Sequence, residues 1–535
     1  MTRVRRQRPT ESPGLAARAA RAAAAALAGL AAAAAAIGAG ELVAAFTGPA
    51  TSPVIAVGSS AIDLTPTPLK EYAVRQFGTN DKPVLLAGIY AVLVLLALLA
   101  GLVAVRRPRA GAAVFLAFGG VGAWAALSRS TATTASALPS LAAGVVGAVV
   151  VLQLAARYRA AVTAARTPEP EGGGPLAVRT ARRQFLIISG GTVAVAAVAG
   201  FGGRALSAAR TDITAARNAV RLPPPALPAP AVPASAHPAV PGLSSFRTPN
   251  ADFYRVDTAL TLPKIDPNDW ALRIHGMVDH PVTISFDELL RRPLEELDHT
   301  LSCVSNEVGG PYVGTARWLG ASLPALLREA GIRSGADQLV GRSKDGMTIG
   351  TPLEALLDGR RALLAVAMNG ETLPVAHGFP CRSVVPGLYG YTSATKWLVD
   401  LEVTTFASYD PYWVQRGWGR EGVVKTASRI EVPAGFAKVP PGTVTVAGTA
   451  WATHRGIAAV EVRVDDGPWA EARLATAVSP DLWRQWSYDW PDARTGSHTL
   501  QVRATDGTGA VQPSDRVPPF PDGATGWHSV VVNVT

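Results

Sequence analysis

The stretch TLSCVSNEVGG, residues 300–310, combines a short apolar strand pattern with a glycine-containing loop. A strand that ends in such a loop presents the thiol of Cys303 at the strand end, where functional side chains are often carried. A lone cysteine is more often a small buried hydrophobic residue than a ligand, so this stretch alone leaves both readings open. The only other cysteine is Cys381, which leaves no disulfide framework and no cysteine-based zinc or iron–sulfur site.

Two later stretches add cationic side chains among turns. Residues 377–390 are HGFPCRSVVPGLYG and residues 392–398 are TSATKWL. Their glycines and prolines predict turns whose backbone can approach a ligand closely. These turns carry His377, Arg382 and Lys396. Because arginine binds phosphate with two parallel hydrogen bonds and lysine acts as a point charge, this pattern suits an anionic phosphate group.

Together these stretches resemble the molybdopterin-binding domain of the sulfite oxidase family, from about residue 245 to about residue 410. In that family a strand-end cysteine coordinates molybdenum, so the resemblance assigns Cys303 as metal ligand and catalytic residue. A thiolate suits a metal that already has two dithiolene sulfur ligands. The resemblance implies the molybdenum–molybdopterin cofactor, and it assigns cofactor contacts to Tyr254, Arg255, Asp257, Ser343, Asp345, His377, Arg382, Ala394, Thr395 and Lys396.

The sequence departs from sulfite-oxidising members of the family beside the cysteine. Those members carry two arginines where this chain has Glu307 and Val308, and another arginine where Val256 stands. Arg317 matches an arginine that lines the family's pocket, so we expect it near molybdenum as a catalytic residue. A carboxylate close to the metal would repel a dianion, which makes a neutral substrate such as a sulfoxide the alternative to sulfite. Cys381 is expected to pack in the core; a Cys303–Cys381 disulfide is the rival interpretation.

The first two hundred residues are predicted to lie in a membrane. The chain has 535 residues, 48% hydrophobic and 17% charged, and its mean hydropathy of +0.20 is high for a soluble enzyme. Five apolar runs, each near the ~20 residues that span a bilayer, are predicted as transmembrane helices; they cover residues 19–46, 83–105, 110–128, 138–156 and 184–203. Buried helices of a soluble protein are the alternative.

Arginines at alternate connections between these runs predict their orientation. Lys and Arg near the ends of membrane helices stay on the cytoplasmic side, so the N-terminus is predicted to be cytoplasmic and everything after about residue 205 to lie outside. The net charge of +10 comes largely from such flanking arginines, and no nucleic-acid partner is expected. Residues 180–186, TARRQFL, resemble a twin-arginine export signal, with simple positive flanking as the alternative.

The remaining chain is predicted to form a linker and two domains. The tract PPPALPAPAVPASAHPAVPG, residues 223–242, favours extended polyproline II, so residues 206–244 are predicted to be a stiff spacer. Short alternating strands after about residue 425 are typical of an immunoglobulin-like sandwich. The predicted fold class is multi-domain: an all-α membrane bundle at 1–205, an α+β molybdopterin-binding domain at 245–424, and an all-β sandwich at 425–535 that resembles the family's dimerisation domain and implies a homodimer.

Three functional hypotheses follow. The first is transfer of an oxygen atom involving a small sulfur compound, with electrons exchanged with an external cytochrome or quinone-linked membrane protein, because the sequence has no haem attachment motif. The second is a sulfoxide reductase that repairs oxidised methionine and docks a quinol-linked partner. The third is a binding module without cofactor. In each case the apolar helices would contact membrane lipid and place the rest of the chain outside the cytoplasm.

Overall fold

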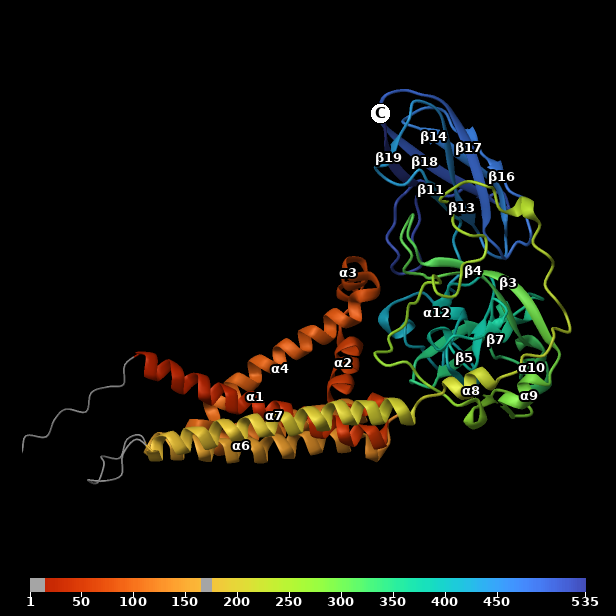
Figure 1. Ribbon diagram of the computed structural model, residues 1–535. Coiled ribbons are helices and arrows are strands. Elements are labelled where there is room, and N and C mark those ends of the chain that lie inside the picture. Colours follow the sequence, from red (N-terminus) through yellow and green to blue (C-terminus); the bar gives the residue numbers. More distant parts are fainter. Residues whose placement is uncertain (1–14, 165–175) are drawn as a thin grey trace, which may run out of the picture. The chain divides into compact units, whose positions relative to one another are not determined.

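The computed structural model describes residues 15–164 and 176–535 (Figure 1). The chain divides into two compact units, which are described separately because their relative position is not determined. The first comprises Met1–Asp212 with Thr258–Thr261, and the second comprises Ile213–Asp257 with Leu262–Thr535.

The first unit is helical. Its described helices are α1 (Leu15–Thr47), α2 (Pro53–Leu64), α3 (Thr67–Phe77), α4 (Asp81–Arg106), α5 (Pro108–Leu127), α6 (Leu138–Ala164) and α7 (Leu176–Arg210). Five helical segments are long and apolar enough to cross a membrane, which confirms that the five predicted apolar runs are helical. Helices α2 and α3 were not predicted, because both are shorter than a membrane span.

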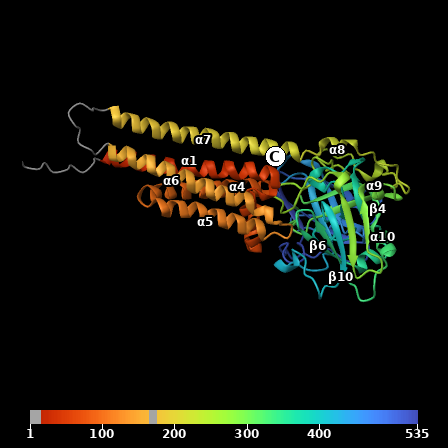
Figure 2. The ribbon, with the colours of Figure 1, turned by 90° about the horizontal axis from the view of Figure 1, so that it is seen from below.

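Small residues let these helices pack closely: α1 and α5 each pack against α6, as Figure 2 shows, whereas Figure 1 shows α4 inclined to them. At the contact of α1 and α4, a Cβ atom on Gly29 would lie 1.9 Å from the carbonyl oxygen of Ala97, and one on Gly101 would lie 2.3 Å from that of Ala25. Only glycine fits at these two positions. Such close backbone contact is the usual packing mode of helices in a lipid environment, where apolar side chains gain little by leaving the lipid.

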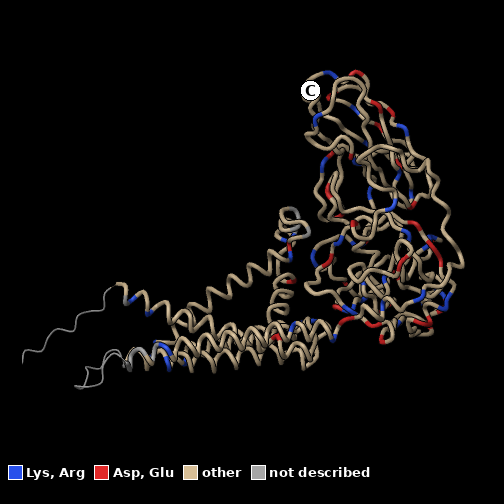
Figure 3. The backbone as a smooth tube through the Cα atoms, viewed as in Figure 1, with Lys and Arg blue, Asp and Glu red and all other residues tan. Residues whose placement is uncertain are grey.

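Charged side chains are sparse along the helices and frequent over the second unit (Figure 3). Described arginines lie near the start of α1 and the end of α6, among them Arg18, Arg21, Arg157 and Arg159. The earlier arginines of the predicted pattern, and Arg166, lie outside the described residues. The predicted orientation across a membrane therefore stays a prediction.

The second unit begins with an α+β region built on two five-stranded sheets. One sheet has the path β3-β4-β7-β8 with β9 paired to β7, and the other has the order β2-β1-β10-β5-β6. The first contains β3 (Leu294–Ser302), β4 (Val313–Ser322), β7 (Leu363–Met368), β8 (Glu371–Thr372) and β9 (Arg382–Val384). The second contains β1 (Ala271–Gly276), β2 (Val282–Ser285), β5 (Gln338–Ser343), β6 (Thr348–Pro352) and β10 (Leu398–Thr404).

Short helices connect these strands: α8 (Thr214–Ala219), α9 (Phe286–Leu290), α10 (Leu323–Ala330), α11 (Glu354–Leu357) and α12 (Gly390–Ser393). Helix α10 shows how the sequence sets their ends. Its N-cap Ser322 accepts a hydrogen bond from the N–H of Ala325, and Gly331 ends the helix with a φ of 73°. Every residue of β7 is buried, as expected for a strand that is covered on both faces.

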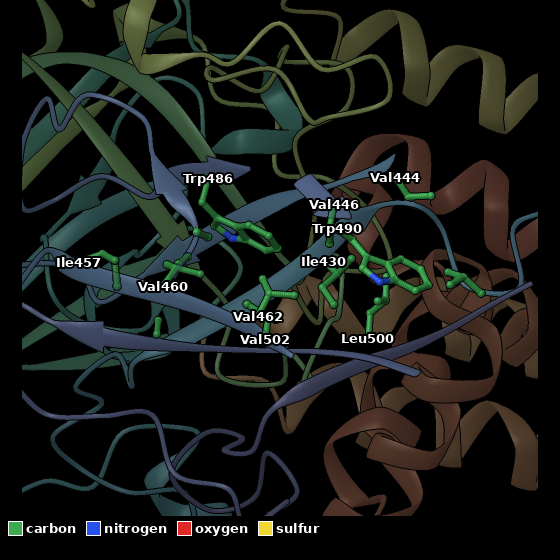
Figure 4. Close-up of a cluster of buried hydrophobic side chains, with 14 of the residues drawn as sticks. Ile430, Val444, Val446, Ile457, Val460, Val462, Trp486, Trp490, Leu500 and Val502 are labelled. Atoms are coloured by element: carbon green, nitrogen blue, oxygen red, sulfur yellow. The ribbon is translucent and has the colours of Figure 1, made fainter. Parts of the chain in front are cut away.

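The C-terminal region is rich in strands, as predicted, and consists of two sheets that share one core (Figure 4). The first sheet is β11 (Ala427–Val432), β13 (Gly442–Trp451), β17 (Arg484–Ala493) and β16 (Arg473–Leu474). The second is β12 (Lys438–Val439), β19 (His528–Val534), β18 (Gly496–Asp506), β14 (Ile457–Val464) and β15 (Ala470–Glu471). Trp486 and Trp490 from the first sheet pack against Val462 and Leu500 from the second.

The Pro/Ala tract, predicted to be a stiff spacer, is attached to the second unit by hydrogen bonds. The N–H groups of Ala226 and Ala229 donate to the carbonyl oxygen of Leu294 (2.7 Å) and to the carboxylate of Glu296 (3.1 Å). Farther along, His237 hydrogen-bonds Gln485 of β17 at 2.7 Å. Strand β3 lies at the edge of its sheet, so backbone groups on its outer side have no partner strand. Non-proline residues of the tract form hydrogen bonds with this edge.

Candidate active site

Cys303 follows the last residue of β3, at the strand end where the sequence placed it. The loop from Cys303 to Tyr312 joins β3 to β4 and is closed by its own hydrogen bonds: Cys303 N–H donates to the Tyr312 carbonyl (2.9 Å), and Tyr312 N–H donates to the Asn306 side chain (2.8 Å). The Cys303 Sγ lies 2.9 Å from the Ser305 hydroxyl. Burial raises the pKa of the Cys303 thiol, while Ser305 and Lys396 act in the opposite direction and favour the thiolate.

Arg382, on β9, is a buried cation without a carboxylate. It is 3% exposed, and its guanidinium donates to the carbonyl oxygens of His377 (3.1 Å) and Ser383 (3.4 Å) and lies 4.9 Å from the ring centre of Trp318. Burial lowers its pKa to about 10, and among the described residues no Asp or Glu contributes to that shift. A buried charge is costly unless an opposite charge is brought to it, so this position fits an anionic ligand.

Lys396 and Arg255 share one carboxylate. The Lys396 Nζ lies 2.5 Å and the Arg255 Nε 2.7 Å from Oδ2 of Asp257. Burial lowers the pKa of Lys396 to about 8 although Asp257 opposes that effect. With Arg382 beside them there are three cations, against the carboxylates of Asp257 and of Asp345 in the neighbouring turn, so these described residues carry an excess of positive charge.

His377 lies at the end of a short 3₁₀ turn, beside this cluster. Its ring meets Phe253 edge to face at 5.6 Å, and its Nε2 donates to the carbonyl oxygen of Asn250 at 3.2 Å. Burial, with the charge of Arg382, lowers the pKa of His377 to about 4, so the ring is neutral at pH 7. The next residue, Gly378, has a φ of 110°, and a Cβ atom there would lie 3.1 Å from the Lys396 backbone and from the Arg382 side chain. Glycine therefore lets the three side chains converge.

The other predicted cofactor contacts lie on the turns beside Lys396. Ser343 ends β5 opposite Leu398, and its hydroxyl is buried with no hydrogen-bond partner within the described part of the chain. The Asp345 carboxylate accepts from the N–H of Met347 at 3.2 Å, in the same turn. Ala394 and Thr395 are buried, and the Thr395 N–H donates to the Ser383 hydroxyl at 2.9 Å.

Aromatic rings stand beside the cysteine. Tyr254 stacks on Phe253 at 5.2 Å and lies 6.2 Å from the ring of Tyr312. Burial raises the pKa of Tyr254 well above its ordinary value, and the nearby Cys303 acts in the same direction. Burial also raises the pKa of Tyr389 to about 12, and its hydroxyl accepts the N–H of Lys425. Both phenols therefore stay protonated at pH 7.

Arg317 is the predicted site residue that the structure places elsewhere. It lies on β4 opposite Asp298, and its Nε and Nη2 donate to the two carboxylate oxygens of Asp298 at 3.0 and 2.7 Å. Val313 pairs with Ser302 beside the cysteine, so four strand residues separate Arg317 from that position, or roughly 13 Å at ~3.3 Å per residue. The strand register, which a motif match does not reveal, pairs the Arg317 guanidinium with Asp298, so its position near the metal stays a prediction.

Three contacts of the site were not predicted. Trp318 offers its ring face to Arg382, Asn250 fixes the ring of His377, and Ser305 hydrogen-bonds the cysteine sulfur. The contact of Ser305 could have been predicted from the sequence, because a hydroxyl two residues after a cysteine can reach the cysteine sulfur. Trp318 and Asn250 come from distant segments, and only the fold brings them to the site.

The site fits an anionic cofactor that carries its own metal. Its cations outnumber its carboxylates, and the buried hydroxyl of Ser343 awaits a hydrogen-bond partner. Among residues 15–164 and 176–535, no group of three or more His, Cys, Asp and Glu side chains could hold a metal ion by itself. A metal at Cys303 therefore needs most of its ligands from the cofactor, which is how a dithiolene-bound metal would be held.

Comparison with known proteins agrees with this chemistry. Residues 259–413 match a family described as the oxidoreductase molybdopterin binding domain. The chain is 32% identical to sulfite oxidase of Gallus gallus over 335 residues, which cover 53% of this chain and 72% of that protein. It is 32% identical to the uncharacterized oxidoreductase YuiH of Bacillus subtilis (strain 168) over 157 residues, 29% of this chain and 76% of that protein. The structure also aligns with the solved structure of the sulfane dehydrogenase SoxCD of Paracoccus pantotrophus, with a TM-score of 0.47 and 24% sequence identity. The alignment covers 54% of this chain and 83% of the SoxCD chain.

Proposed function

Because the chain belongs to the sulfite oxidase family and is an oxidoreductase that uses the molybdenum–molybdopterin cofactor, we propose that it transfers an oxygen atom to or from a small sulfur-containing substrate. The observation that carries this proposal is the convergence of Cys303 with two buried cations, Lys396, which is paired with Asp257, and Arg382, for which the described residues show no carboxylate partner. The bound cofactor supplies the two-electron chemistry of oxygen transfer. The protein binds that cofactor, orients it and shapes the substrate pocket.

Each polar residue of the site has a proposed task. Cys303 provides the thiolate ligand, with the Ser305 hydroxyl holding its sulfur in place. Arg382 and Lys396 neutralise the anionic phosphate, and neutral His377 adds a hydrogen bond without adding charge. The predicted contacts Tyr254, Arg255, Asp257, Ser343, Asp345, Ala394 and Thr395 stay with this cluster as proposed cofactor contacts, whereas Arg317 does not.

The surroundings of Cys303 support a sulfur–oxygen substrate that is held mainly by hydrogen bonds. Arg317 is paired with Asp298, so it is not available as the pocket cation that the sequence suggested. Besides the cations assigned to the cofactor, protonated phenols and the Ser305 hydroxyl lie near Cys303 and can hydrogen-bond an oxygen atom. These groups can also bind a neutral sulfoxide, which is the substrate of the reductive alternative. Both sulfite and a sulfoxide are therefore tested as substrates.

We further propose that the five long apolar helices anchor the chain in the cell membrane and that the second unit lies outside the cytoplasm. Their length and hydropathy support the anchor, and the arginine pattern supports the orientation. TARRQFL would then serve export of a folded, cofactor-loaded unit by the twin-arginine route. Electrons would be exchanged with an external carrier, a cytochrome or a quinone-linked membrane protein.

The C-terminal region, 425–535, is proposed to be an immunoglobulin-like sandwich that forms a homodimer. Two sheets around a shared core support the sandwich. On the outer side of the second sheet, Trp469 and Trp527 meet at 4.9 Å, and the guanidinium of Arg503 lies 4.4 Å from the ring centre of Trp469. Partly exposed tryptophan and arginine are the residues most enriched where protein interfaces are strongest.

The test is turnover of sulfite and of methionine sulfoxide by purified protein with soluble artificial electron carriers, comparing wild type with Cys303→Ser. We expect one of the two substrates to turn over in wild type, and the variant to keep the pterin, which the cations hold, but to lose activity. Cys381→Ser is the matched control, because Cys381 is fully buried away from solvent and has no assigned ligand role. Wild-type activity in Cys303→Ser would contradict the proposed function.

A further inference from the structure

The loop from Cys303 to Tyr312 is bound to the C-terminal region as well as to itself. The guanidinium of Arg429, on β11, donates to the carbonyl oxygen of Gly310 at 2.9 Å. The ring of His528, at the start of β19, packs on the preceding residue: a Cβ atom on Gly309 would lie 2.2 Å from both Cδ2 and Nε2 of this ring. Since Gly309 also has a φ of 78°, only glycine fits there. Two side chains of the C-terminal region therefore hold the last turn of the loop.

Both side chains are themselves fixed within the second unit. Burial and the charge of Arg429 lower the pKa of His528 to about 4, so the ring is neutral at pH 7. Its Nδ1 accepts the N–H of Ile430 at 3.0 Å. Arg429 donates through Nε and Nη2 to one oxygen of Glu431, at 3.0 and 2.6 Å, and the other oxygen of Glu431 accepts the N–H of Ser244 at 2.8 Å. Side chains that are anchored in this way can fix the segment that they contact.

Hydrogen bonds connect this turn to the cysteine. The N–H of Gly310 donates to the carbonyl oxygen of Glu307 at 2.8 Å, and the N–H of Asn306 donates to the carbonyl oxygen of Cys303 at 3.1 Å. Between them lies Ser305, whose hydroxyl is 2.9 Å from the Cys303 Sγ. A shift of Gly310 therefore moves the backbone that carries the Ser305 hydroxyl relative to the sulfur.

The C-terminal region also binds the strand that leads to Cys303. The N–H of Thr300, on β3, donates to the carbonyl oxygen of Asp481 at 3.0 Å, and the Thr300 hydroxyl accepts the N–H of Trp483 at 2.7 Å. One region thus holds the backbone on both sides of the cysteine.

We propose that Arg429 and His528 are positioning residues, which hold the loop so that the Cys303 sulfur and the Ser305 hydroxyl keep the arrangement needed to bind a metal. Residues 425–535 would then help to build the active site, in addition to the proposed role in dimer formation. This role rests on the proposed function, which assigns Cys303 as the metal ligand. The alternative is a purely structural role, in which the two side chains stabilise the fold and the loop keeps its shape without them.

The experiment measures hydrogen–deuterium exchange of the purified full chain, resolved to peptides that cover residues 303–312. Within this loop the N–H groups of Cys303, Asn306, Gly310 and Tyr312 are hydrogen-bonded, so their exchange reports opening of the loop. Thermal unfolding is measured on the same samples, because a general loss of stability would speed exchange throughout the second unit.

Two conservative variants remove the contacts with the loop. In His528→Asn the side-chain oxygen can replace Nδ1 as the acceptor for Ile430, but the ring edge that packs on Gly309 is gone. Arg429→Lys keeps a cation beside Glu431 but replaces the planar fork, whose Nη1 reaches Gly310, by a single nitrogen. Each should speed exchange of the loop peptide about tenfold, and the melting temperature should change by less than about 3 °C.

His498→Asn is the matched control, because the ring of His498 hydrogen-bonds Asp465 and Arg494, which lie outside the loop. Its loop peptide should exchange as in wild type. The inference is overturned if both loop variants exchange as wild type does. It is also overturned if exchange accelerates equally across the second unit, since this would reveal a role in stability alone.

Turnover of sulfite and of methionine sulfoxide is measured on the same samples and divided by the molybdenum content. In His528→Asn we expect kcat to fall about tenfold and KM to stay within about twofold, because the contact fixes the sulfur rather than the substrate. In a Ser305→Ala background the same substitution should lower kcat less than about twofold further, since its effect passes through the Ser305 hydroxyl. An undiminished kcat in His528→Asn, or a full additional tenfold loss in that background, would refute the positioning role.

The two proposals can fail separately, because hydrogen exchange does not depend on turnover. An active wild type whose loop exchange is the same in all variants would refute the inference alone. A wild type that turns over neither substrate, with faster loop exchange in the two variants only, would refute the proposed function and leave the attachment of the loop established.

Discussion

Replacing Arg317 by glutamine tests whether this side chain supports the fold or the substrate. Its guanidinium donates two charge-assisted hydrogen bonds to Asp298, whose side chain is 5% exposed, and one to the carbonyl oxygen of Pro230. Arg247 also binds the Asp298 carboxylate, at 3.1 Å, and keeps this ion pair in the variant. Asp298 therefore loses only one of its two arginine partners. We estimate a loss of about 3 kcal/mol in the free energy of unfolding. For a unit of this size the melting temperature should fall by roughly 5 °C.

The assay pairs thermal unfolding with steady-state kinetics on the active substrate. KM should change less than about twofold, because the guanidinium is bound to Asp298 and the backbone of Arg317 lies four strand residues, roughly 13 Å, from the cysteine end. Arg333→Gln is the control: its ion pair with Asp279 is exposed, with both side chains 58% accessible, and its loss should change stability by less than about 1 kcal/mol. A tenfold rise in KM for Arg317→Gln at an unchanged melting temperature would refute the assignment.

Three further variants address the cofactor grip and the C-terminal region. Arg382→Gln removes the buried cation, and pterin content, measured by fluorescence after release, should fall to below about one fifth of wild type. Trp486→Ala should lower the free energy of unfolding by about 4 kcal/mol in urea titrations, because the ring is fully buried in the core. Burial alone would raise the pKa of Asp506, but hydrogen bonds from Thr508, Arg455 and Thr426 outweigh it and hold that pKa well below its usual value. This carboxylate therefore stabilises the fold above pH ~4, and the effect is lost as pH falls through its folded pKa; Asp506→Asn should be about 3 kcal/mol less stable than wild type at pH 7, with a smaller difference at pH 3.

The parts of the site that lie on one continuous stretch were predictable from the sequence. Cys303 at a strand end, Arg382 at the start of β9 and Lys396 in a later turn come from motifs that carry their own local geometry. The contact of Arg317 with Asp298 could not be predicted, because a side chain in mid-strand is placed by register and by its partners, and this carboxylate comes from another strand. Trp318 and Asn250 were missed for the same reason.

The fold shows a similar division. Apolar runs predicted the five long helices because a membrane span needs only length and hydropathy. Alternating residues predicted the C-terminal strands, since one face of each strand packs into the core, as in β18. The attachment of the Pro/Ala tract could not be predicted, because composition describes its conformation but not its hydrogen-bond partners on the edge of β3.

The most direct test of the account is the molybdenum content of the purified full chain, measured by inductively coupled plasma mass spectrometry after expression in a host that makes the cofactor. We propose that Arg382 and the neighbouring cations bind an anionic cofactor, and that Cys303 binds its metal. The account predicts about one molybdenum per chain in wild type, with matching pterin. Wild-type protein that is folded but free of molybdenum and pterin would contradict it and leave a binding module in its place.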